Sequence, residues 1–126
     1  MTRGRPAIEP SRQRQRRNRD GAAAEVIAAM YLMAHGHRIL ARRFKTPLGE
    51  IDLITRKGRR IGFVEVKLRR TRLDCEAAIT PRLGQRVRRA AGLWHAKHEA
   101  YRDFDTGFDL VFVMPWQWPV YLRDAF

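Results

Sequence analysis

The stretch GEIDLITRKGRRIGFVEVKL, residues 49–68, decides the fold of this chain. Residues 50–55 and 61–68 are rich in β-branched side chains, as is typical of strands. The RKGRR segment between them contains Gly58, which favours a tight turn. The stretch therefore predicts an antiparallel hairpin of two strands.

The segments before this hairpin are predicted to form a helix and a further strand. Residues 37–44, HRILARRF, are strand-like. Residues 21–34, GAAAEVIAAMYLMA, predict a helix with Asn18 or Asp20 as its N-cap. Because this helix is apolar on every face, we expect it to be buried on all sides.

After the hairpin the pattern predicts a second helix and a return to the sheet. A loop at residues 69–79 leads to Thr80-Pro81, an N-cap followed by proline in the first helical position. The helix runs to about His98, and its predicted buried face consists of Leu83, Val87, Ala90, Ala91 and Trp94. Residues 108–114 (FDLVFVM) predict a fourth strand, parallel to the third, and residues 120–122 a short edge strand. We expect an α/β fold, α-β-β-β-α-β, with a mixed central sheet.

The composition limits the classes of function. The 126 residues carry a net charge of +13, which points to a polyanionic partner. Residues 1–19 hold seven Arg and one acidic residue, so we predict a disordered basic tail followed by one domain at residues 20–126. A single cysteine and the lack of a long apolar run indicate a cytoplasmic protein. An anionic membrane surface is a weaker alternative partner, since no basic amphipathic helix with an aromatic face is present.

Four ionisable residues interrupt segments that should be buried. Glu25 lies on the apolar helix, and Asp52 lies between Ile51 and Leu53. Strand alternation predicts Asp52 on one face with Glu50 and Ile54, and Glu65 with Lys67 on one face of the next strand. Two alternatives involve no functional site. The strand charges could form a cross-strand ion pair on a solvated face, and Glu25 could pair with an arginine.

These residues also suit metal-dependent hydrolysis of a phosphodiester. Asp52, Glu65 and the Val66 carbonyl are hard oxygen ligands of the kind that Mg²⁺ prefers, and Glu25 could complete the site directly or through water. A bound Mg²⁺ or Mn²⁺ lowers the pKa of its water. Lys67 is placed to orient that water or to stabilise charge on the phosphate.

Three motifs occur together in this chain: Gly21-x-x-Ala24-Glu25, GEIDLI at residues 49–54 and FVEVK at residues 63–67. In combination they resemble the YraN-like family of predicted bacterial endonucleases. That family belongs with the restriction-endonuclease-like PD-(D/E)xK nucleases and is similar to archaeal Holliday-junction resolvases. The resemblance covers residues 20–126 and implies an α/β/α sandwich that cleaves DNA, possible dimerisation and a divalent-metal site.

The resemblance also implies roles for individual residues. Asp52 and Glu65 would be metal ligands, Glu25 the acidic residue on the helix and Lys67 the catalytic lysine. Phe108-Asp109 matches the family's fourth strand. Where the family usually has Lys-Gln early in the second helix, this chain has Leu83-Gly84-Gln85, so Gln85 is the substitute we expect in the active site.

Arginines flank the predicted site and suggest how nucleic acid is held. Arg69 and Arg70 follow the third strand, and Arg82, Arg86 and Arg89 share one face of the second helix. Such a stripe suits the phosphate backbone, although an ordinary solvated helix face looks the same in sequence. We therefore expect a DNA endonuclease. The alternative is a non-catalytic nucleic-acid-binding module that retains the fold.

Overall fold

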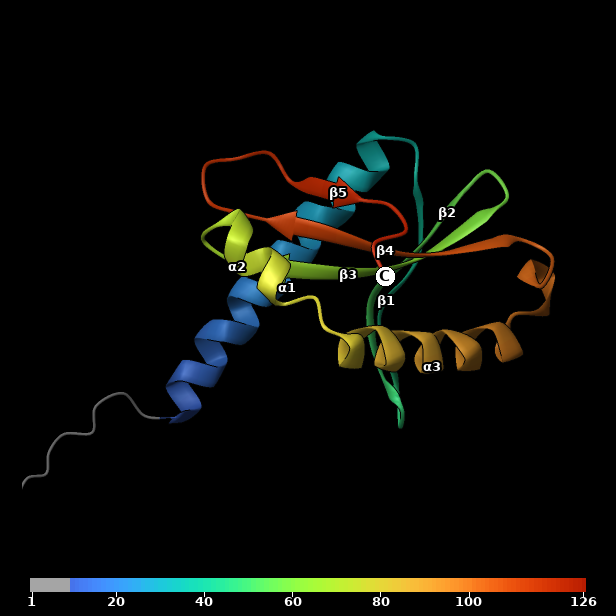
Figure 1. Ribbon diagram of the computed structural model, residues 1–126, viewed down its shortest axis with the longest axis horizontal. Helices are drawn as coiled ribbons and strands as arrows, with labels where there is room; N and C mark the ends of the chain where they lie inside the picture. Colours follow the sequence, from blue (N-terminus) through green and yellow to red (C-terminus); the bar gives the residue numbers. More distant parts are fainter. Residues whose placement is uncertain (1–9) are drawn as a thin grey trace, which may run out of the picture.

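The protein is a three-layer α/β sandwich with a mixed sheet at its centre. The computed structural model describes residues 10–126 of the chain. The elements are α1 (Pro10–Ala34), β1 (Arg38–Thr46), β2 (Gly49–Lys57), β3 (Arg60–Leu68), α2 (Arg72–Ala77), α3 (Pro81–Lys97), the 3₁₀ turn η1 (Glu99–Tyr101), β4 (Asp105–Val113) and β5 (Val120–Leu122) (Figure 1). The strands follow the order β1-β2-β3-β4-β5, with β3 and β4 parallel and the other neighbours antiparallel. The predicted fold class and strand directions are confirmed.

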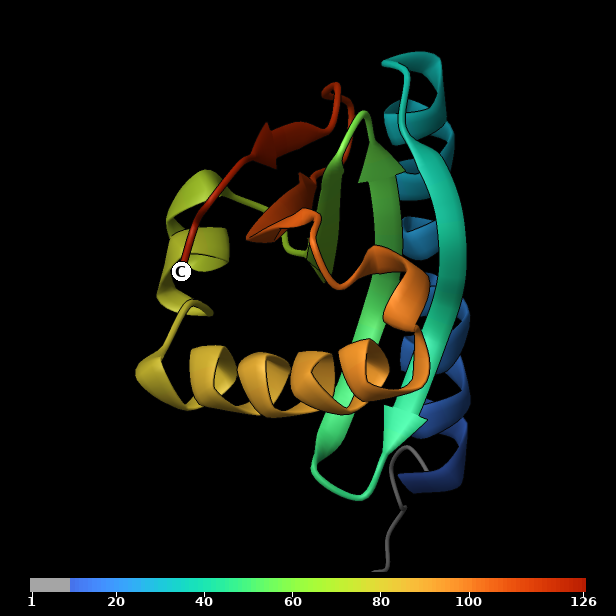
Figure 2. The ribbon, with the colours of Figure 1, turned by 90° about the vertical axis from the view of Figure 1, so that its right-hand side faces the viewer.

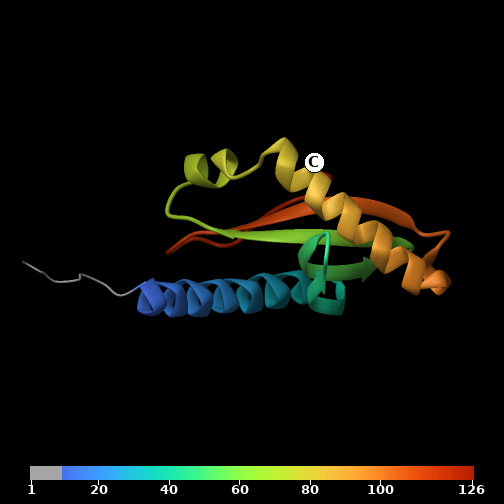
Figure 3. The same cartoon turned by 90° about the horizontal axis from the view of Figure 1, so that it is seen from below.

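The two long helices cover opposite faces of the sheet. Seen from below, α1 lies under the sheet and α3 above it (Figure 3), and the side view shows α3 running across the strands (Figure 2). Ala28, Leu32 and Val64 belong to the core between α1 and the sheet. Phe63, Val87 and Trp94 belong to the core beneath α3. The predicted buried face of this second helix is confirmed.

The predicted loop at residues 69–79 contains a short helix that the sequence analysis missed. Helix α2 is capped by Thr71, whose side chain accepts a hydrogen bond from the Asp74 backbone N–H. A capping residue followed three positions later by an acidic one is a helix-start signal, but six residues are too few for periodicity to show. Cys75 of α2 and Phe112 of β4 belong to a third, smaller core.

Helix α1 starts earlier than the sequence predicts. It begins at Pro10, whereas the expected start was near Asp20. Residues 11–20 contain no glycine or proline and are rich in Arg and Gln, which are good helix formers, so the helix extends through them. The predicted domain boundary thus falls inside α1, and the part of the predicted tail at residues 1–9 lies outside the described residues.

The expectation that α1 is buried on all sides is also wrong. Its outer face exposes four large apolar side chains, Val26, Ile27, Met30 and Met33. The sheet can cover only one side of a helix, and no other element of the described chain packs over the opposite side. Trp116 and Trp118 are exposed as well, on the turn before β5. In the described part of the chain no helix meets the length and apolarity that crossing a membrane requires.

Candidate active site

Asp52 lies where β2 separates from β3. The ladder between these strands ends at the pair Leu53–Val64, and beyond it the Asp52 carboxylate accepts a hydrogen bond of 2.8 Å from the Val66 backbone N–H. The predicted alternation of residues 50, 52 and 54 fails here. Ile51 packs beneath α3 and Leu53 against α1, and between them the side chain of Asp52, not its backbone, bonds to β3.

Glu65 lies on the neighbouring strand and is almost fully buried, with 3% of its surface exposed. Its Oε2 atom is 3.7 Å from Lys67 Nζ and 3.6 Å from Arg86 Nη2. Its Oε1 atom is buried and has no hydrogen-bond partner among the described residues. The expected side-by-side placement of Glu65 and Lys67 agrees with their contact. A buried carboxylate oxygen without a donor is costly, so it marks a place where a cation would be stabilising.

The two carboxyl groups influence each other's charge. Burial, and after it the charge of the nearby Asp52 carboxyl, raise the pKa of Glu65 to about 8 against the lowering effects of Lys67, Arg86 and the Asp52 backbone. Burial likewise raises the pKa of Asp52 to about 6, against the lowering effect of the Val66 hydrogen bond. In the absence of a cation, the pair therefore retains a proton near neutral pH.

A pocket of about 420 Å³ opens beside this pair. Its walls come from the middle of α1, from β2 and from the end of β3, and they are formed by Asp20, Gly21, Ala24, Glu25, Asp52, Val66, Lys67, Leu68 and Arg69. The Lys67 side chain is 18% exposed, so its ammonium group is reachable from the pocket. Both an acidic and a basic group thus face one cavity.

Glu25 faces this cavity but is held by an arginine. Its carboxylate accepts a hydrogen bond of 2.7 Å from Arg43 Nε. The arginine partner for Glu25, which the sequence left open as an alternative, is therefore present. Arg43 adopts a left-handed backbone conformation with φ of 52°, which is uncommon for a residue other than glycine. Sequence reasoning did not single out Arg43, because nothing local distinguishes it from the neighbouring Arg42.

The residues present fit a divalent cation of the magnesium type. Among the described residues no group of three or more His, Cys, Asp or Glu side chains gathers to hold a metal. Mg²⁺ does not require one, because it keeps several waters and binds through one or two carboxylates. Asp52 and Val66 line the pocket, and Glu65 does not line it but lies beside them, in contact with Lys67. The two carboxylates and the Val66 carbonyl would form such a donor set. The unpartnered Oε1 of Glu65 is the observation that favours the fit.

Helix α3 contributes Arg86 to the site and not Gln85. Gln85 is exposed and does not line the pocket, since successive helical residues point about 100° apart. Arg86 reaches Glu65 by passing over Gly49, where an added Cβ would overlap its side chain. The other predicted nucleic-acid contacts, Arg70, Arg82 and Arg89, are exposed, and Arg69 lines the pocket.

Comparisons with known proteins identify the family. The model described as "Uncharacterised protein family UPF0102" matches residues 24–113, which include Glu25, Asp52, Glu65 and Lys67. The UPF0102 protein mlr4633 of Mesorhizobium japonicum is 44% identical over 120 residues, 95% of this chain and 96% of that protein. A UPF0102 protein of Rhodopseudomonas palustris (strain BisA53) is 42% identical over 126 residues, 100% of this chain and 97% of that protein. One from Methylorubrum populi is 45% identical over 122 residues, 97% of this chain and 98% of that protein.

These matches confirm the resemblance at the level of the family, whereas kinship with the restriction-endonuclease-like nucleases stays a prediction. The matched segment runs from α1 to the end of β4 and so contains both strands that carry the candidate site. The chain belongs to the UPF0102 family.

Proposed function

We propose that the protein is a divalent-metal-dependent endonuclease that hydrolyses phosphodiester bonds of DNA in the cytoplasm. One observation carries the proposal. Asp52 and Glu65 converge from neighbouring strands beside Lys67, and one oxygen of the buried Glu65 has no partner among the described residues. Two carboxylates next to an amine are the groups that metal-assisted phosphoryl chemistry requires.

Each residue has a distinct task in this proposal. Asp52, Glu65 and the Val66 carbonyl would hold Mg²⁺ or Mn²⁺, which supplies a water of lowered pKa and offsets charge on the phosphate. The Val66 N–H fixes the Asp52 carboxylate, so this ligand is oriented before any cation binds. The Lys67 ammonium group donates hydrogen bonds to the phosphate or to the attacking water.

The distribution of arginines supports a nucleic-acid substrate. Arg69 lines the pocket, and exposed arginines extend along α3 from Arg82 to Arg89. These side chains suit contacts to phosphates and carry no pattern for reading bases, so we expect recognition of backbone or shape. The resemblance adds a preference for structured or branched DNA over RNA, and a homodimer.

The test is cleavage of supercoiled and branched DNA by the full chain with Mg²⁺, with Mn²⁺ and with EDTA. We expect cleavage only with metal, and its loss in Asp52→Asn, because the asparagine side chain can still accept the Val66 hydrogen bond and keep the strand in place. Asp103→Asn, an exposed position in the turn before β4, is the matched control. Equal cleavage by wild type and Asp52→Asn would remove Asp52 from the mechanism.

A non-catalytic nucleic-acid-binding module is the second candidate function. The observation that favours it is the Arg43–Glu25 ion pair, which occupies a carboxylate that the nuclease would use. In that case the protein binds DNA with and without metal and cleaves neither substrate. Cleavage by the wild type with metal separates the two candidates. If cleavage is found, Glu25→Gln should suppress it where that carboxylate serves the metal, and the melting temperature reports any damage to the core.

A further inference from the structure

A second polar pocket lies at the other end of the sheet. It measures about 260 Å³ and is lined by His37, Lys57, Arg60, Tyr121 and Arg123. Arg60 lines this pocket at the start of β3, and Lys67 lines the first pocket seven positions further along the same strand. At 3.3 Å per residue, these two strand positions are about 23 Å apart. No carboxylate lines this pocket, whereas three of its five residues are permanent cations.

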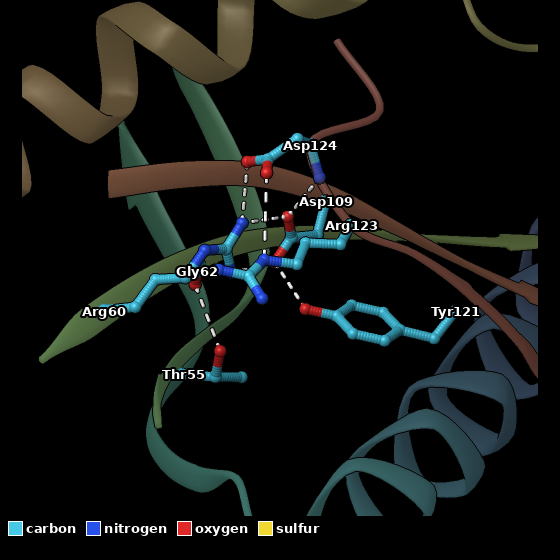
Figure 4. Close-up of polar contacts among 7 residues, drawn as sticks. All are labelled: Thr55, Arg60, Gly62, Asp109, Tyr121, Arg123 and Asp124. Carbon is cyan, nitrogen blue, oxygen red and sulfur yellow. Dashed lines mark hydrogen bonds and ion pairs between the residues drawn. The ribbon is translucent and has the colours of Figure 1, made fainter. Parts of the chain in front are cut away.

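The Arg60 guanidinium group is held rigidly (Figure 4). Arg60 donates two hydrogen bonds, of 2.8 and 2.9 Å, to the two oxygens of Asp109, and a third of 2.8 Å to Asp124. Asp109 is fully buried and also accepts from the Tyr121 hydroxyl and the Asp124 backbone N–H. With four hydrogen bonds its carboxylate is saturated, so Asp109 has no lone pair left for the pocket.

The other two cations are only weakly compensated. Within the described residues no carboxylate pairs with Lys57, whose side chain lies over Gly36. Arg123 lies 3.7 Å from Asp124, a carboxylate already bonded to Arg60. Three cations against the two carboxylates of this network leave an excess of one positive charge (3 − 2 = 1).

His37 completes the wall, and one of its ring nitrogens, Nδ1, is buried without a hydrogen-bond partner in the described part of the chain. The residue is 8% exposed, and its ring meets the Tyr121 ring edge-on at 5.3 Å. Burial lowers the pKa of His37, and the charges of Lys57, Arg60 and His35 lower it further against the opposing effect of Asp109. Because the Asp109 carboxylate is already saturated, the charged groups near the His37 ring that can still bind a ligand are cations.

We propose that this pocket binds a phosphate oxyanion. The anion would be held by the Lys57 and Arg123 side chains and by the positive field of the fixed Arg60, in a pocket that the His37 ring also lines. Arginine and lysine beside a buried polar ring are typical of oxyanion recognition, and the volume admits a phosphate group with part of an ester. The site does not depend on metal-assisted cleavage at the other end of the sheet.

The phosphate could come from the free ion or from the end of a nucleic acid, and the experiment distinguishes these sources. The full chain is titrated with inorganic phosphate at constant ionic strength, with chloride as the reference salt, while the imidazole signals of the histidines are followed by NMR. We expect phosphate to raise the pKa of His37, because the bound anion stabilises the protonated ring. The same titration with a short oligonucleotide carrying a 5′-phosphate, and with its unphosphorylated counterpart in EDTA, shows whether a terminal phosphate is preferred.

Two variants test the pocket and keep Arg60 and both of its carboxylate partners, Asp109 and Asp124. Lys57→Gln and Arg123→Gln each remove one exposed cation, and we expect either to weaken phosphate binding about tenfold, as for loss of a charge-assisted hydrogen bond. Lys97→Gln, an exposed lysine at the end of α3, is the matched control and should bind as wild type does. An unchanged His37 titration in the wild type, or equal weakening in Lys97→Gln, would overturn the proposal.

Discussion

Replacing Glu65 with Gln should stabilise the metal-free protein near neutral pH. Glu65 is buried with one oxygen unpartnered among the described residues, and burial raises its pKa from 4.5 to about 8. The folded chain therefore keeps a proton on Glu65 at pH 7 that the unfolded chain has released. Glutamine has nearly the same shape and never ionises, so the variant avoids this cost.

The size of the effect follows from linkage. Between the unfolded pKa of 4.5 and pH 7, at 1.36 kcal/mol per pH unit, the wild type loses at most about 3 kcal/mol of its free energy of unfolding. For a domain of this size that corresponds to a rise of about 10 °C in the melting temperature of the variant. Because the pKa of this carboxyl group is higher in the folded state, the wild type loses stability as the pH rises. The loss is absent below pH 4.5 and grows until the pH reaches about 8.

The assay is thermal and urea unfolding of wild type and Glu65→Gln in EDTA at several values between pH 5 and pH 8. The difference in stability should be small at pH 5 and largest at pH 8. Glu99→Gln, an exposed position in the turn after α3, is the control and should show no such dependence. Equal stabilities of wild type and Glu65→Gln across this range would refute the idea that Lys67 and Arg86 compensate the buried Glu65 only in part.

The same pair of proteins tests the proposed metal site. Added Mn²⁺ or Mg²⁺ should raise the melting temperature of the wild type, because a ligand that binds only the folded state stabilises it. It should leave Glu65→Gln unchanged, since an amide is a poor replacement for a carboxylate ligand. A metal-dependent shift of equal size in both proteins would place the ion elsewhere.

Three further predictions concern packing and charge at other positions. Asp109→Asn should lower the free energy of unfolding by about 3–5 kcal/mol at pH 7, because it leaves the guanidinium group of Arg60 without its buried partner. Burial raises the pKa of Asp109, but the hydrogen bonds from Arg60, the Asp124 backbone and Tyr121 together outweigh it and lower that pKa. This difference should therefore shrink as the pH falls through and below 3.8 in urea titrations. Gly49→Ala should destabilise by about 1–3 kcal/mol in the same assay, because its Cβ would overlap Arg86 and its φ of 153° disfavours other residues. Gly92→Ala, where an added Cβ meets nothing, should instead stabilise α3 by up to about 1 kcal/mol, and destabilisation there would contradict this account.

The hairpin and its charged residues could be predicted because they depend on local sequence. A short turn around Gly58 forces β2 and β3 to be antiparallel neighbours, which brings Asp52 near residues 65–67 whatever the rest of the chain does. Strand alternation likewise placed Glu65 beside Lys67. The alternation failed at Asp52 itself, because its side chain, and not its backbone, bonds to Val66.

The partners of these residues depend on contacts between distant segments. Arg43 is one of several arginines in β1, and only the packing of α1 on the sheet selects it as the partner of Glu25. Helix periodicity marks the side of α3 that is buried, but the angle at which the helix crosses the sheet brings Arg86 over Gly49 and leaves Gln85 in solvent. The outer face of α1 is a similar case. Composition shows that the helix is apolar, but only the layer order shows that no helix or strand among residues 10–126 covers its outer side. Short-range patterns thus specify the elements and their nearest neighbours, whereas the match between a cation and its carboxylate comes from three-dimensional packing.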